Sequence, residues 1–307
     1  MSFKLNYLSI CSGIEAASVA WNHLGWEPVG FSETDSFASA VLNHHYPEVK
    51  NYGDMTQCHT WEISSKIDIL VGGTPCQSFS FAGKRTGMDD LRGQLAIKFF
   101  DIVKKYRPKW IVWENVPGVL CSNKGKDFGL FLSNMSKCGY GFAYRILDAQ
   151  HFGVPQRRRR VFVVGYHEDW RYAAAVLFQK NNLFEKIKRN NLSQTISLQD
   201  VREIQKKQNG CGWNDSGIAY TVDTHATQGV VYKKDESHIV RRLTLLEYER
   251  LQGFPDNYSQ IKWKNYQVEE CPDEKRFKVL GNSMAVPVMR WIGNRIDYVQ
   301  NILSRIS

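Results

Sequence analysis

The sequence predicts an α/β fold in which a doubly wound sheet is followed by a smaller, irregular second domain. Two observations lead to this expectation. Short apolar runs alternate with helical patterns through the first 165 residues, and this alternation stops after about residue 170. Strands alternating with helices are typical of doubly wound sheets, whose ligands bind at the carboxyl ends of the strands. A chain of 307 residues is long enough for one large domain and one small domain.

The expected strands are short apolar runs, and the expected helices carry apolar residues at helical spacing. The strands cover residues 7–10, 28–32, 67–71, 110–113, 144–147 and 161–165. The helices between them cover residues 15–24, 36–45, 94–106 and 128–137. Regular structure is expected again over residues 243–251, and a closing helix over residues 286–303.

The middle of the chain has a different character. Residues 179–240 are polar, lack clear periodicity and contain clusters such as KRNN and KKQNG. Because a loop of this length is uncommon in a compact domain, a separate domain is the better interpretation. We therefore expect a first domain over residues 1–170 and a second over approximately 171–275, with 241–255 at the hinge. A C-terminal segment, 276–307, is expected to return to the first domain.

Charge and cysteine content limit the classes of partner and compartment. Forty Lys and Arg against 31 Asp and Glu give a net charge of +9 and a pI near 9.1, which is compatible with a polyanionic partner. No run approaches the roughly 18 apolar residues of a membrane span, and the N-terminus lacks a basic-then-apolar leader. The seven scattered cysteines form no C-x-x-C pair, so neither a disulfide framework nor a metal site is predicted. A cytoplasmic location fits best.

Small and acidic residues follow the first expected strands. Cys11-Ser12-Gly13-Ile14 makes a turn after the first strand, and Glu33 ends the second. In a doubly wound sheet such a turn lies beside a nucleotide-like cofactor, and the acid can accept hydrogen bonds from ribose hydroxyls. Since no G-x-G-x-x-G pattern is present, a plain tight turn and an exposed capping carboxylate explain these residues equally well. Asp54 could likewise be a turn residue.

Cys76 lies in the stretch GGTPCQSFSFAG, directly after an expected strand. A small buried residue is the commoner role of a cysteine, but a position after a proline and among glycines is unusual for packing. Two other strand ends carry charge: WENVPG contains Glu114, and GVPQRRRR contains the arginines 157–160. Guanidinium groups suit phosphates and carboxylates. A thiol, an acid and arginines at strand ends together indicate one chemical site.

These three motifs, in this order, resemble the PCQ, ENV and Q-x-R-x-R motifs of the DNA cytosine-5 methyltransferases, of the bacterial or phage type. The segments 242–255 and 281–287 resemble the last two motifs of that family. The resemblance covers both ends of the chain and leaves out the middle. It implies the mixed sheet of S-adenosylmethionine-dependent methyltransferases, with a catalytic and cofactor-binding domain over 1–170 and a target-recognition domain over 171–275.

The resemblance also implies a mechanism. In this family a cysteine thiolate adds to carbon 6 of cytosine, which makes carbon 5 nucleophilic enough to take a methyl group from S-adenosylmethionine. Cys76 is then the thiolate, and Glu114 protonates or hydrogen-bonds cytosine N3. Arg158 and Arg160 hold the target cytosine and its backbone. The base must be flipped out of the duplex, and the basic charge of the protein helps to bind the DNA.

Further roles follow from the resemblance alone. Near the substrate it places Gln77, Ser78, Asn115, Gln156, Thr221 and Val222. In the cofactor pocket it places Cys11, Ser12, Gly13, Ile14, Glu33, Asp54, Met55, Pro75, Leu95 and Asn282. Two departures bear on cofactor affinity: the usual Phe-x-Gly-x-Gly-Gly turn is CSGIEA here, and the tryptophan that often follows the ribose-binding acid is Thr34.

The leading hypothesis is a sequence-specific DNA cytosine-5 methyltransferase, monomeric and acting on double-stranded DNA, with a cognate restriction endonuclease as a candidate partner. An RNA cytosine-5 methyltransferase is the first alternative, because one branch of the family acts on tRNA. A second alternative is a non-catalytic DNA-binding protein with a degraded cofactor site. A thiol hydrolase that uses Cys76 is a more distant one.

Overall fold

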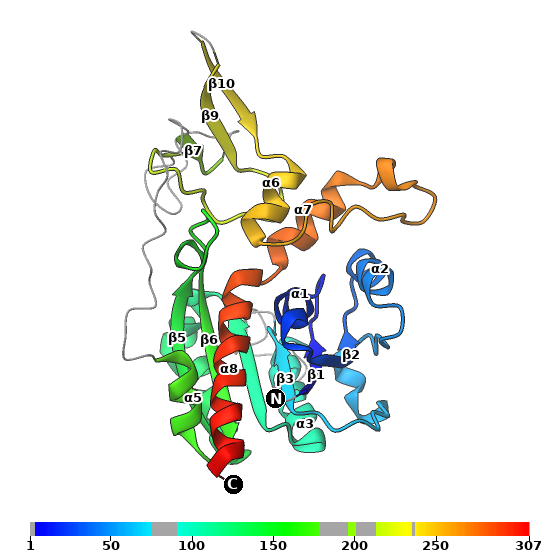
Figure 1. The fold of residues 1–307 in the computed structure, drawn as a ribbon, viewed down its shortest axis with the longest axis vertical. Coiled ribbons are helices and arrows are strands. Elements are labelled where there is room, and N and C mark those ends of the chain that lie inside the picture. The colour runs from blue at the N-terminus through cyan, green and yellow to red at the C-terminus, as the bar shows by residue number, and fades with distance from the viewer. Residues whose placement is uncertain (1–3, 75–90, 179–195, 201–212, 235–236, 307) are drawn as a thin grey trace. The chain divides into compact units, whose positions relative to one another are not determined.

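A computed structural model describes residues 4–74, 91–178, 196–200, 213–234 and 237–306 (Figure 1). Contacts divide the chain into two compact units. Unit 1 comprises residues 1–147, 160–181 and 289–307, and unit 2 comprises residues 148–159 and 182–288. Relative to the boundaries expected from sequence, unit 2 includes two additional segments, 148–159 and 276–288. None of the helices in the described ranges is long and apolar enough to cross a membrane.

Unit 1 is built on a six-stranded mixed sheet with the strand order β2-β1-β3-β4-β6-β5. Its strands are β1 (Asn6–Ile10), β2 (Glu27–Ser32), β3 (Ile69–Gly72), β4 (Trp110–Asn115), β5 (Tyr140–Asp148) and β6 (Arg159–His167). Strands β2, β1, β3 and β4 pair in parallel, and β6 pairs antiparallel to β4. The carboxyl ends of β1 to β4 therefore meet at one edge of the sheet, where ligands of such folds bind.

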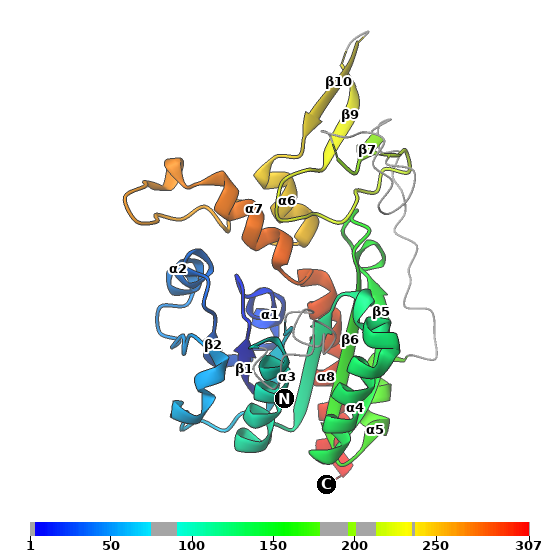
Figure 2. The same ribbon diagram turned by 180° about the vertical axis from the view of Figure 1, so that it is seen from behind.

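Helices cover both faces of this sheet. They are α1 (Ala16–Trp21), α2 (Ser36–His45), α3 (Leu91–Tyr106), α4 (Lys126–Lys137), α5 (Trp170–Leu177) and α8 (Val286–Ile306). Helices α1 and α8 lie in front of the sheet in Figure 1, whereas α3 and α4 lie in front of it in the reverse view of Figure 2. The indole of Trp21 donates to the carbonyl of Met289 at 2.8 Å, which ties α1 to α8.

Short 3-10 helices fill several connections. They span Asn22–Leu24, Met55–Thr60, Pro117–Leu120, Ser122–Gly125, Ala149–His151 and Val268–Glu270. The first of these follows α1, so the single helix expected over residues 15–24 is divided in two. Gly25 ends this 3-10 helix in the left-handed region, with φ of 68°. Glycine adopts this conformation without strain.

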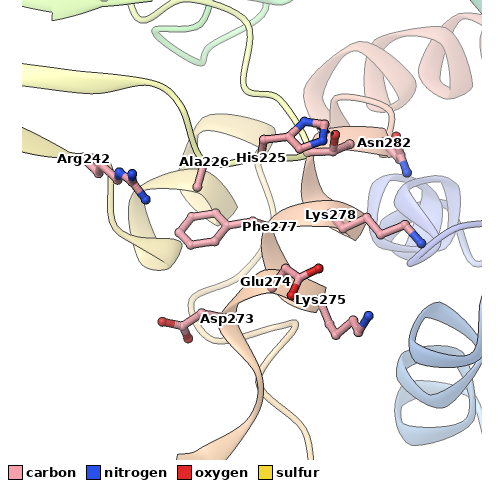
Figure 3. Close-up of a pocket in the computed structure, with 10 residues that line it drawn as sticks. His225, Ala226, Arg242, Asp273, Glu274, Lys275, Phe277, Lys278 and Asn282 are labelled. Atoms are coloured by element: carbon pink, nitrogen blue, oxygen red, sulfur yellow. Dashed lines mark hydrogen bonds between the residues drawn. The ribbon is translucent and has the colours of Figure 1, made fainter. Parts of the chain in front are cut away.

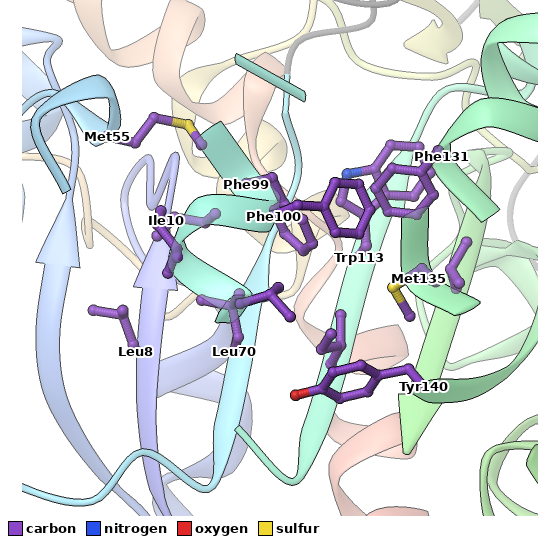
Figure 4. Close-up of a cluster of buried hydrophobic side chains, with 14 of the residues drawn as sticks. Leu8, Ile10, Met55, Leu70, Phe99, Phe100, Trp113, Phe131, Met135 and Tyr140 are labelled. Atoms are coloured by element: carbon purple, nitrogen blue, oxygen red, sulfur yellow. The ribbon is translucent and has the colours of Figure 1, made fainter. Parts of the chain in front are cut away.

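An aromatic cluster forms the centre of the core in unit 1 (Figure 4). The ring of Trp113 on β4 stacks on Phe131 of α4 with a centroid distance of 4.2 Å, and Phe100 of α3 contacts Phe131 at 5.2 Å. Trp113 and Phe131 are almost fully buried. Because side chains of this size contribute several kcal/mol each when buried, the end of β4 is firmly positioned.

Unit 2 contains a four-stranded sheet with the order β10-β9-β7-β8. Its strands are β7 (Ile196–Leu198), β8 (Trp213–Asn214), β9 (Gly229–Lys234) and β10 (Ser237–Arg242), all paired antiparallel. Two helices follow, α6 (Leu245–Gln252) and α7 (Asp273–Asn282). A capping box of Thr244 and Glu247 starts α6, which satisfies otherwise unpaired N–H groups.

The expected α/β architecture is confirmed, with most elements within a few residues of their expected bounds. The expectation of irregular structure across residues 179–240 is wrong for its described part, which contains the β7–β10 sheet. The apolar residues of β9 and β10 are few and interrupted by charges, so the alternation of a half-buried strand was hard to recognise. Helix α7 was missed for a similar reason, since its sequence DEKRFKVLGN is mostly polar.

Candidate active site

Two side chains of β4 hold the main chain just after the end of β3. The side-chain amide of Asn115 donates to the carbonyl of Thr74 at 2.9 Å, and the indole N–H of Trp113 donates to the Thr74 hydroxyl at 3.2 Å. Thr74 is 2% exposed. These two contacts fix the chain two residues before Cys76. Cys76 and its neighbours Pro75, Gln77 and Ser78 lie outside the described residues.

Glu114 lies between the end of β3 and the start of β6. The Nε of Arg160 lies 3.2 Å from Oε1 of Glu114, and both side chains are largely buried. A Cβ atom built on Gly73 would lie 2.7 Å from the carbonyl oxygen of Glu114 and 3.1 Å from its Oε2. Only glycine therefore permits this close approach of the two strand ends. The structure thus brings Glu114 and Arg160 together beside the segment that leads to Cys76.

The four arginines of GVPQRRRR do not share one environment. Arg157 and Arg159 are exposed, and Arg160 pairs with Glu114. Arg158 is 2% exposed. This alternation follows from the extended backbone at the start of β6, in which successive side chains point to opposite faces.

The guanidinium of Arg158 binds backbone carbonyls of unit 2. It donates to Ser283 at 2.7 Å, to Gly281 at 3.1 Å and to Val222 at 3.4 Å. These carbonyls come from two distant segments of the chain. Arg158 therefore holds together the segment at Val222 and the end of α7, whereas the resemblance assigned it to the target cytosine.

Gln156 makes a second buried connection in unit 2. Its Nε2 donates to the carbonyl of Leu251 at 2.8 Å and to Oε1 of Gln252 at 3.1 Å. Its Oε1 accepts the backbone N–H of Val222 at 3.0 Å. The hydroxyl of Thr221 donates to the carbonyl of Arg157. The structure thus brings together three residues that were predicted to lie near the substrate: Gln156, Thr221 and Val222.

Gln252 is a buried residue of this network that the sequence-based assignment missed. Its Nε2 donates to the carbonyls of Leu280 at 2.6 Å and Ser283 at 3.1 Å. The side chain is fully buried. The signal was its place in the QGFP segment at the end of α6, where a glutamine beside apolar residues needs internal partners. Gln252 joins α6 to the end of α7.

The turn after β1 has an unusual backbone. Cys11, Gly13 and Glu15 have φ values of 47°, 57° and 65°, so left-handed residues alternate with Ser12 and Ile14. A non-glycine residue in this region costs about 1–3 kcal/mol, so the surroundings must hold Cys11 and Glu15 in place. Around Gly13 a Cβ would meet no heavy atom within 4 Å. The turn therefore presents open space at Gly13.

Glu33, at the end of β2, organises this turn. Its Oε2 accepts the N–H of Gly13 at 2.8 Å, and its Oε1 accepts the N–H groups of Thr34 and Asp35 at 2.8 and 2.7 Å. Asn51 holds the Glu33 backbone through its side-chain amide, at 3.0 and 3.1 Å. Because a carboxylate offers about four acceptor sites, Glu33 retains capacity for a further donor such as a ribose hydroxyl.

The other described residues predicted for the cofactor pocket have different surroundings. The Cys11 thiol contacts Met55 Sδ at 3.7 Å, and Asp54 is exposed and accepts the N–H of Thr56 at 2.8 Å. Leu95 is half-buried on α3. Asn282 belongs to unit 2, where it is exposed at the end of α7.

Two carboxylates lie near the Cys11 thiol of this turn. Burial raises the pKa of the Cys11 thiol to about 12, and the nearby carboxylates of Glu33 and Asp54 add to this shift. Cys11 therefore stays protonated and is unsuited to nucleophilic attack. Carboxylates beside a small turn with open space at Gly13 fit a ligand that carries positive charge and hydroxyl donors, as the sulfonium nucleoside S-adenosylmethionine does.

Glu15 is a third acidic group at this turn. Its side chain is fully buried and caps α1 by accepting the N–H of Ser18 at 3.1 Å. Burial raises the pKa of Glu15 to about 7. Its Oε2 has no hydrogen-bond partner in the described part of the chain. Glu15 stands where the family usually has glycine, and it was not predicted as a site residue.

Unit 2 also contains an open hollow of about 840 Å³ beside α7 (Figure 3). It is lined by Thr224, His225, Ala226, Arg242, Asp273, Glu274, Lys275, Phe277, Lys278 and Asn282. Its lining mixes both signs of charge, with Phe277 between Arg242 and the helix in the figure. Among the described residues, no group of three or more His, Cys, Asp or Glu side chains could hold a metal ion.

Comparison with known proteins decides the family. The family model described as C-5 cytosine-specific DNA methylase matches residues 5–219 and 180–297. The chain belongs to this family. Among curated members, it is 30% identical to the type II methyltransferase M.HpaII of Haemophilus parainfluenzae, over 95% of this chain and 89% of that protein.

Two further similarities show the range of proteins that this chain resembles. It is 30% identical, over 95% of its length, to a protein of Escherichia phage P1 named DNA N-6-adenine-methyltransferase, and it spans 61% of that longer protein. The crystal structure of the Dnmt2 methyltransferase of S. pombe matches 98% of this chain and 99% of that chain, with a TM-score of 0.66 and 19% identity. The fold is therefore shared with Dnmt2.

Proposed function

We propose that this chain methylates carbon 5 of a flipped-out cytosine in double-stranded DNA, with Cys76 as the covalent nucleophile. The observation that carries the proposal is a set of contacts that link the chain after β3, the end of β4 and the start of β6. Trp113 and Asn115 hold Thr74, two residues before Cys76, while Arg160 holds Glu114 beside Gly73. Thr74, two residues before the cysteine in the sequence, and the acid are thereby held at neighbouring strand ends, which supports a joint role in addition to a pyrimidine ring.

The proposed roles follow from the chemistry of the ring. The Cys76 thiolate adds to carbon 6, and electron density moves towards carbon 5. Glu114 donates a proton or a hydrogen bond to cytosine N3 and so takes up the charge that develops there. Arg160 orients the Glu114 carboxyl group. After transfer, a water or hydroxide takes the proton from carbon 5, the carbon–sulfur bond breaks, the carbon 5–carbon 6 double bond re-forms, and the sulfur of Cys76 leaves as a thiolate.

S-adenosylmethionine is the proposed cofactor, and when bound it supplies the methyl group. The turn Cys11–Ile14 would hold its amino-acid part, and Glu33 its ribose hydroxyls. Asp54, Met55, Leu95 and Pro75 would surround the adenine and the sulfur, with Asn282 as a further contact. Support comes from the open space at Gly13 and the acidic surroundings of the turn. These fit a cationic nucleoside.

The role of Arg158, Gln156 and Val222 is proposed to be indirect. Their hydrogen bonds run within unit 2, so they would shape the backbone that contacts DNA. Gln77, Ser78 and Asn115 are proposed near the substrate, with Asn115 supporting the segment at Thr74. We further propose that the enzyme acts as a monomer in the cytoplasm, where its DNA substrate lies, beside a cognate restriction endonuclease.

Methylation of adenine N6 is a second candidate, favoured by the name of the phage P1 relative. An exocyclic amine carries its own nitrogen nucleophile and needs no adduct at a ring carbon. A cysteine two residues after Thr74, and an acid paired with Arg160 at the neighbouring strand end, would then have no chemical use. The arrangement therefore favours cytosine.

The experiment that tests the proposal measures the modified nucleoside. The purified protein is incubated with duplex DNA, or with a tRNA transcript, and labelled S-adenosylmethionine, and the digested nucleosides are separated. We expect 5-methylcytosine from duplex DNA, and Cys76→Ala should abolish it, whereas Cys121→Ala, at an exposed free cysteine, should not. N6-methyladenine as the sole product, or transfer to the tRNA alone, would contradict the proposal.

A further inference from the structure

The β9–β10 ribbon of unit 2 has two unlike faces. Its strands are antiparallel, with His238 opposite Lys233, Val240 opposite Val231 and Arg242 opposite Gly229. Residues directly opposite each other in such a pair project to the same face of the ribbon, and successive residues alternate between faces. Positions 238, 240 and 242 therefore share one face, and positions 237, 239 and 241 share the other.

The face that carries positions 239 and 241 is engaged within unit 2. The guanidinium of Arg241 binds both carboxylate oxygens of Glu247, each at 2.8 Å, and lies over the ring of Tyr232 at 5.5 Å. Val230, opposite Arg241, is buried, and Ile239 is half-buried. Arg241 thereby fastens the ribbon to the start of α6, and this face is unsuited to binding another molecule.

The face that carries positions 238, 240 and 242 is open. His238 and Arg242 are exposed, and the side chain of Val240 is 52% exposed between them. We call these three residues the open face. It offers, in order along one strand, a ring with hydrogen-bonding nitrogens, an apolar β-branched group and a guanidinium.

We propose that the open face lies in the major groove of duplex DNA and determines part of the target sequence. This inference rests on the proposed function, which makes duplex DNA the substrate. The major groove of B-form DNA, about 12 Å wide, admits a two-stranded β-ribbon. Arg242 would bind the O6 and N7 atoms of guanine, Val240 would contact the methyl group of thymine, and His238 would bond a base edge.

The spacing of the open face matches the DNA. Alternate residues of a strand are roughly 6.8 Å apart, since each residue advances about 3.4 Å. Base pairs also advance about 3.4 Å along each strand. His238, Val240 and Arg242 therefore correspond to base pairs two steps apart, and the residues between them point away from the bases. The deep, narrow major groove of A-form RNA does not admit such a ribbon.

The experiment uses the full-length protein and a library of duplexes with randomised sequence. Methylated members are identified by bisulfite sequencing, which gives the base preference at each position for the wild type, for Val240→Thr and for Arg242→Gln. Val240→Thr keeps the shape and the strand preference but replaces a methyl group with a hydroxyl. Ser237→Ala, exposed on the opposite face of the ribbon, is the matched control.

We expect Val240→Thr to relax the preference at one base pair, and Arg242→Gln to relax it about 10-fold to 100-fold at a base pair two steps away. Ser237→Ala should leave all preferences unchanged. Unchanged preferences in both open-face variants, or an equal effect of Ser237→Ala, would overturn the proposal. Thermal melting of each variant guards against a folding defect.

A binding measurement separates this inference from the proposed function. The same library is selected for binding without any methyl donor, so the sequence preference is read even if no methylation occurs. If the wild type binds selectively and the open-face variants lose that selectivity, the inference holds although the catalytic proposal fails. Equal affinity of the wild type for duplex RNA and duplex DNA of one sequence would contradict placement in the major groove.

Discussion

Arg160 approaches Glu114 from the neighbouring antiparallel strand, with its Nε 3.2 Å from Oε1 of the carboxylate. The pairing of β4 with β6 sets this contact, because Asn115 lies opposite Val161 in the register. Glu114 directly precedes Asn115, and Arg160 directly precedes Val161, so this register brings the two charged side chains close together. The position of the proposed acid is therefore set by the sheet itself, which is more rigid than a loop.

Glu114→Gln should lower kcat about 100-fold to 10,000-fold, because the amide cannot donate a proton to the cytosine ring. Unfolding temperature should change little, since the amide keeps the size of the side chain. Initial rates of methyl transfer at saturating DNA and cofactor check this. A fall confined to KM would show that Glu114 serves binding and not the chemical step.

Arg160→Lys should reduce methyl transfer at least about 10-fold, because an ammonium group cannot reproduce the planar geometry of a guanidinium towards a carboxylate. The matched control is Arg159→Lys, at the exposed neighbouring position, which should retain near wild-type kcat. Comparable losses in the two variants would indicate that general basic charge, and not the contact with Glu114, matters here.

Gly73→Ala should impair both folding and activity. The added Cβ would lie 2.7 Å from the Glu114 carbonyl oxygen, and such overpacking typically costs 1–3 kcal/mol. Gly129→Ala is the control, because an added Cβ there meets nothing within 4 Å and the position is exposed on α4. It should stabilise the protein by about 0.5–1 kcal/mol. Urea unfolding measures both changes.

Arg158→Lys should destabilise unit 2 by roughly 2–4 kcal/mol, because three buried carbonyls lose donors at the same time. Arg157→Lys, at the exposed neighbour, should change the unfolding free energy by less than about 0.5 kcal/mol. Denaturant unfolding compares them. Full stability of Arg158→Lys combined with lost catalysis would instead favour direct contact of Arg158 with the cytosine.

Glu15 should make stability depend on pH. Burial raises its pKa from 4.5 to about 7 in the folded protein, so between these values the folded state binds more protons than the unfolded state. Stability from this group is therefore fully present below pH 4.5 and is lost as pH rises through about 7. Glu15→Gln should remove this slope and unfold at higher urea concentration at pH 8.

The control for this pH effect is Glu48→Gln, at an exposed glutamate. It should leave the pH dependence of the urea midpoint as in the wild type. If the wild type shows no decline in stability between pH 5 and 8 that Glu15→Gln removes, then Glu15 is not held in the buried, partly protonated state inferred from the structure.

The sequence predicted those parts of the fold that local pattern controls. The helix Ser36–His45 was expected at the bounds that the structure has, because Asp35 caps it and its apolar residues recur at helical spacing. The β9–β10 ribbon was not expected. Its open face carries His238 and Arg242, so hydrophobic alternation, which reports burial, gave little signal there.

Candidate members of the site could be named from the sequence, but the contacts between them could not. Motif resemblance pointed to Glu114 and Arg160, and their contact depends on the register of two strands, which a single sequence does not specify. It also placed Arg158 with the substrate, although a buried guanidinium among carbonyls is a tertiary property. Glu15 was overlooked because its importance lies in a left-handed backbone and complete burial.

The side chains of Gln156 and Arg158 bind five main-chain groups of unit 2: the carbonyls of Val222, Leu251, Gly281 and Ser283, and the N–H of Val222. Main-chain atoms are the same whatever side chain a position carries. These hydrogen bonds therefore do not depend on the side chains of Val222, Leu251 and Ser283, whereas Gly281 must stay glycine because a Cβ there would lie 2.3 Å from the carbonyl oxygen of Asp223. None of these bonds involves a residue of β9 or β10, so the strands that present the open face can change in sequence without loss of them. Such an arrangement lets target preference diverge during evolution while these hydrogen bonds stay intact.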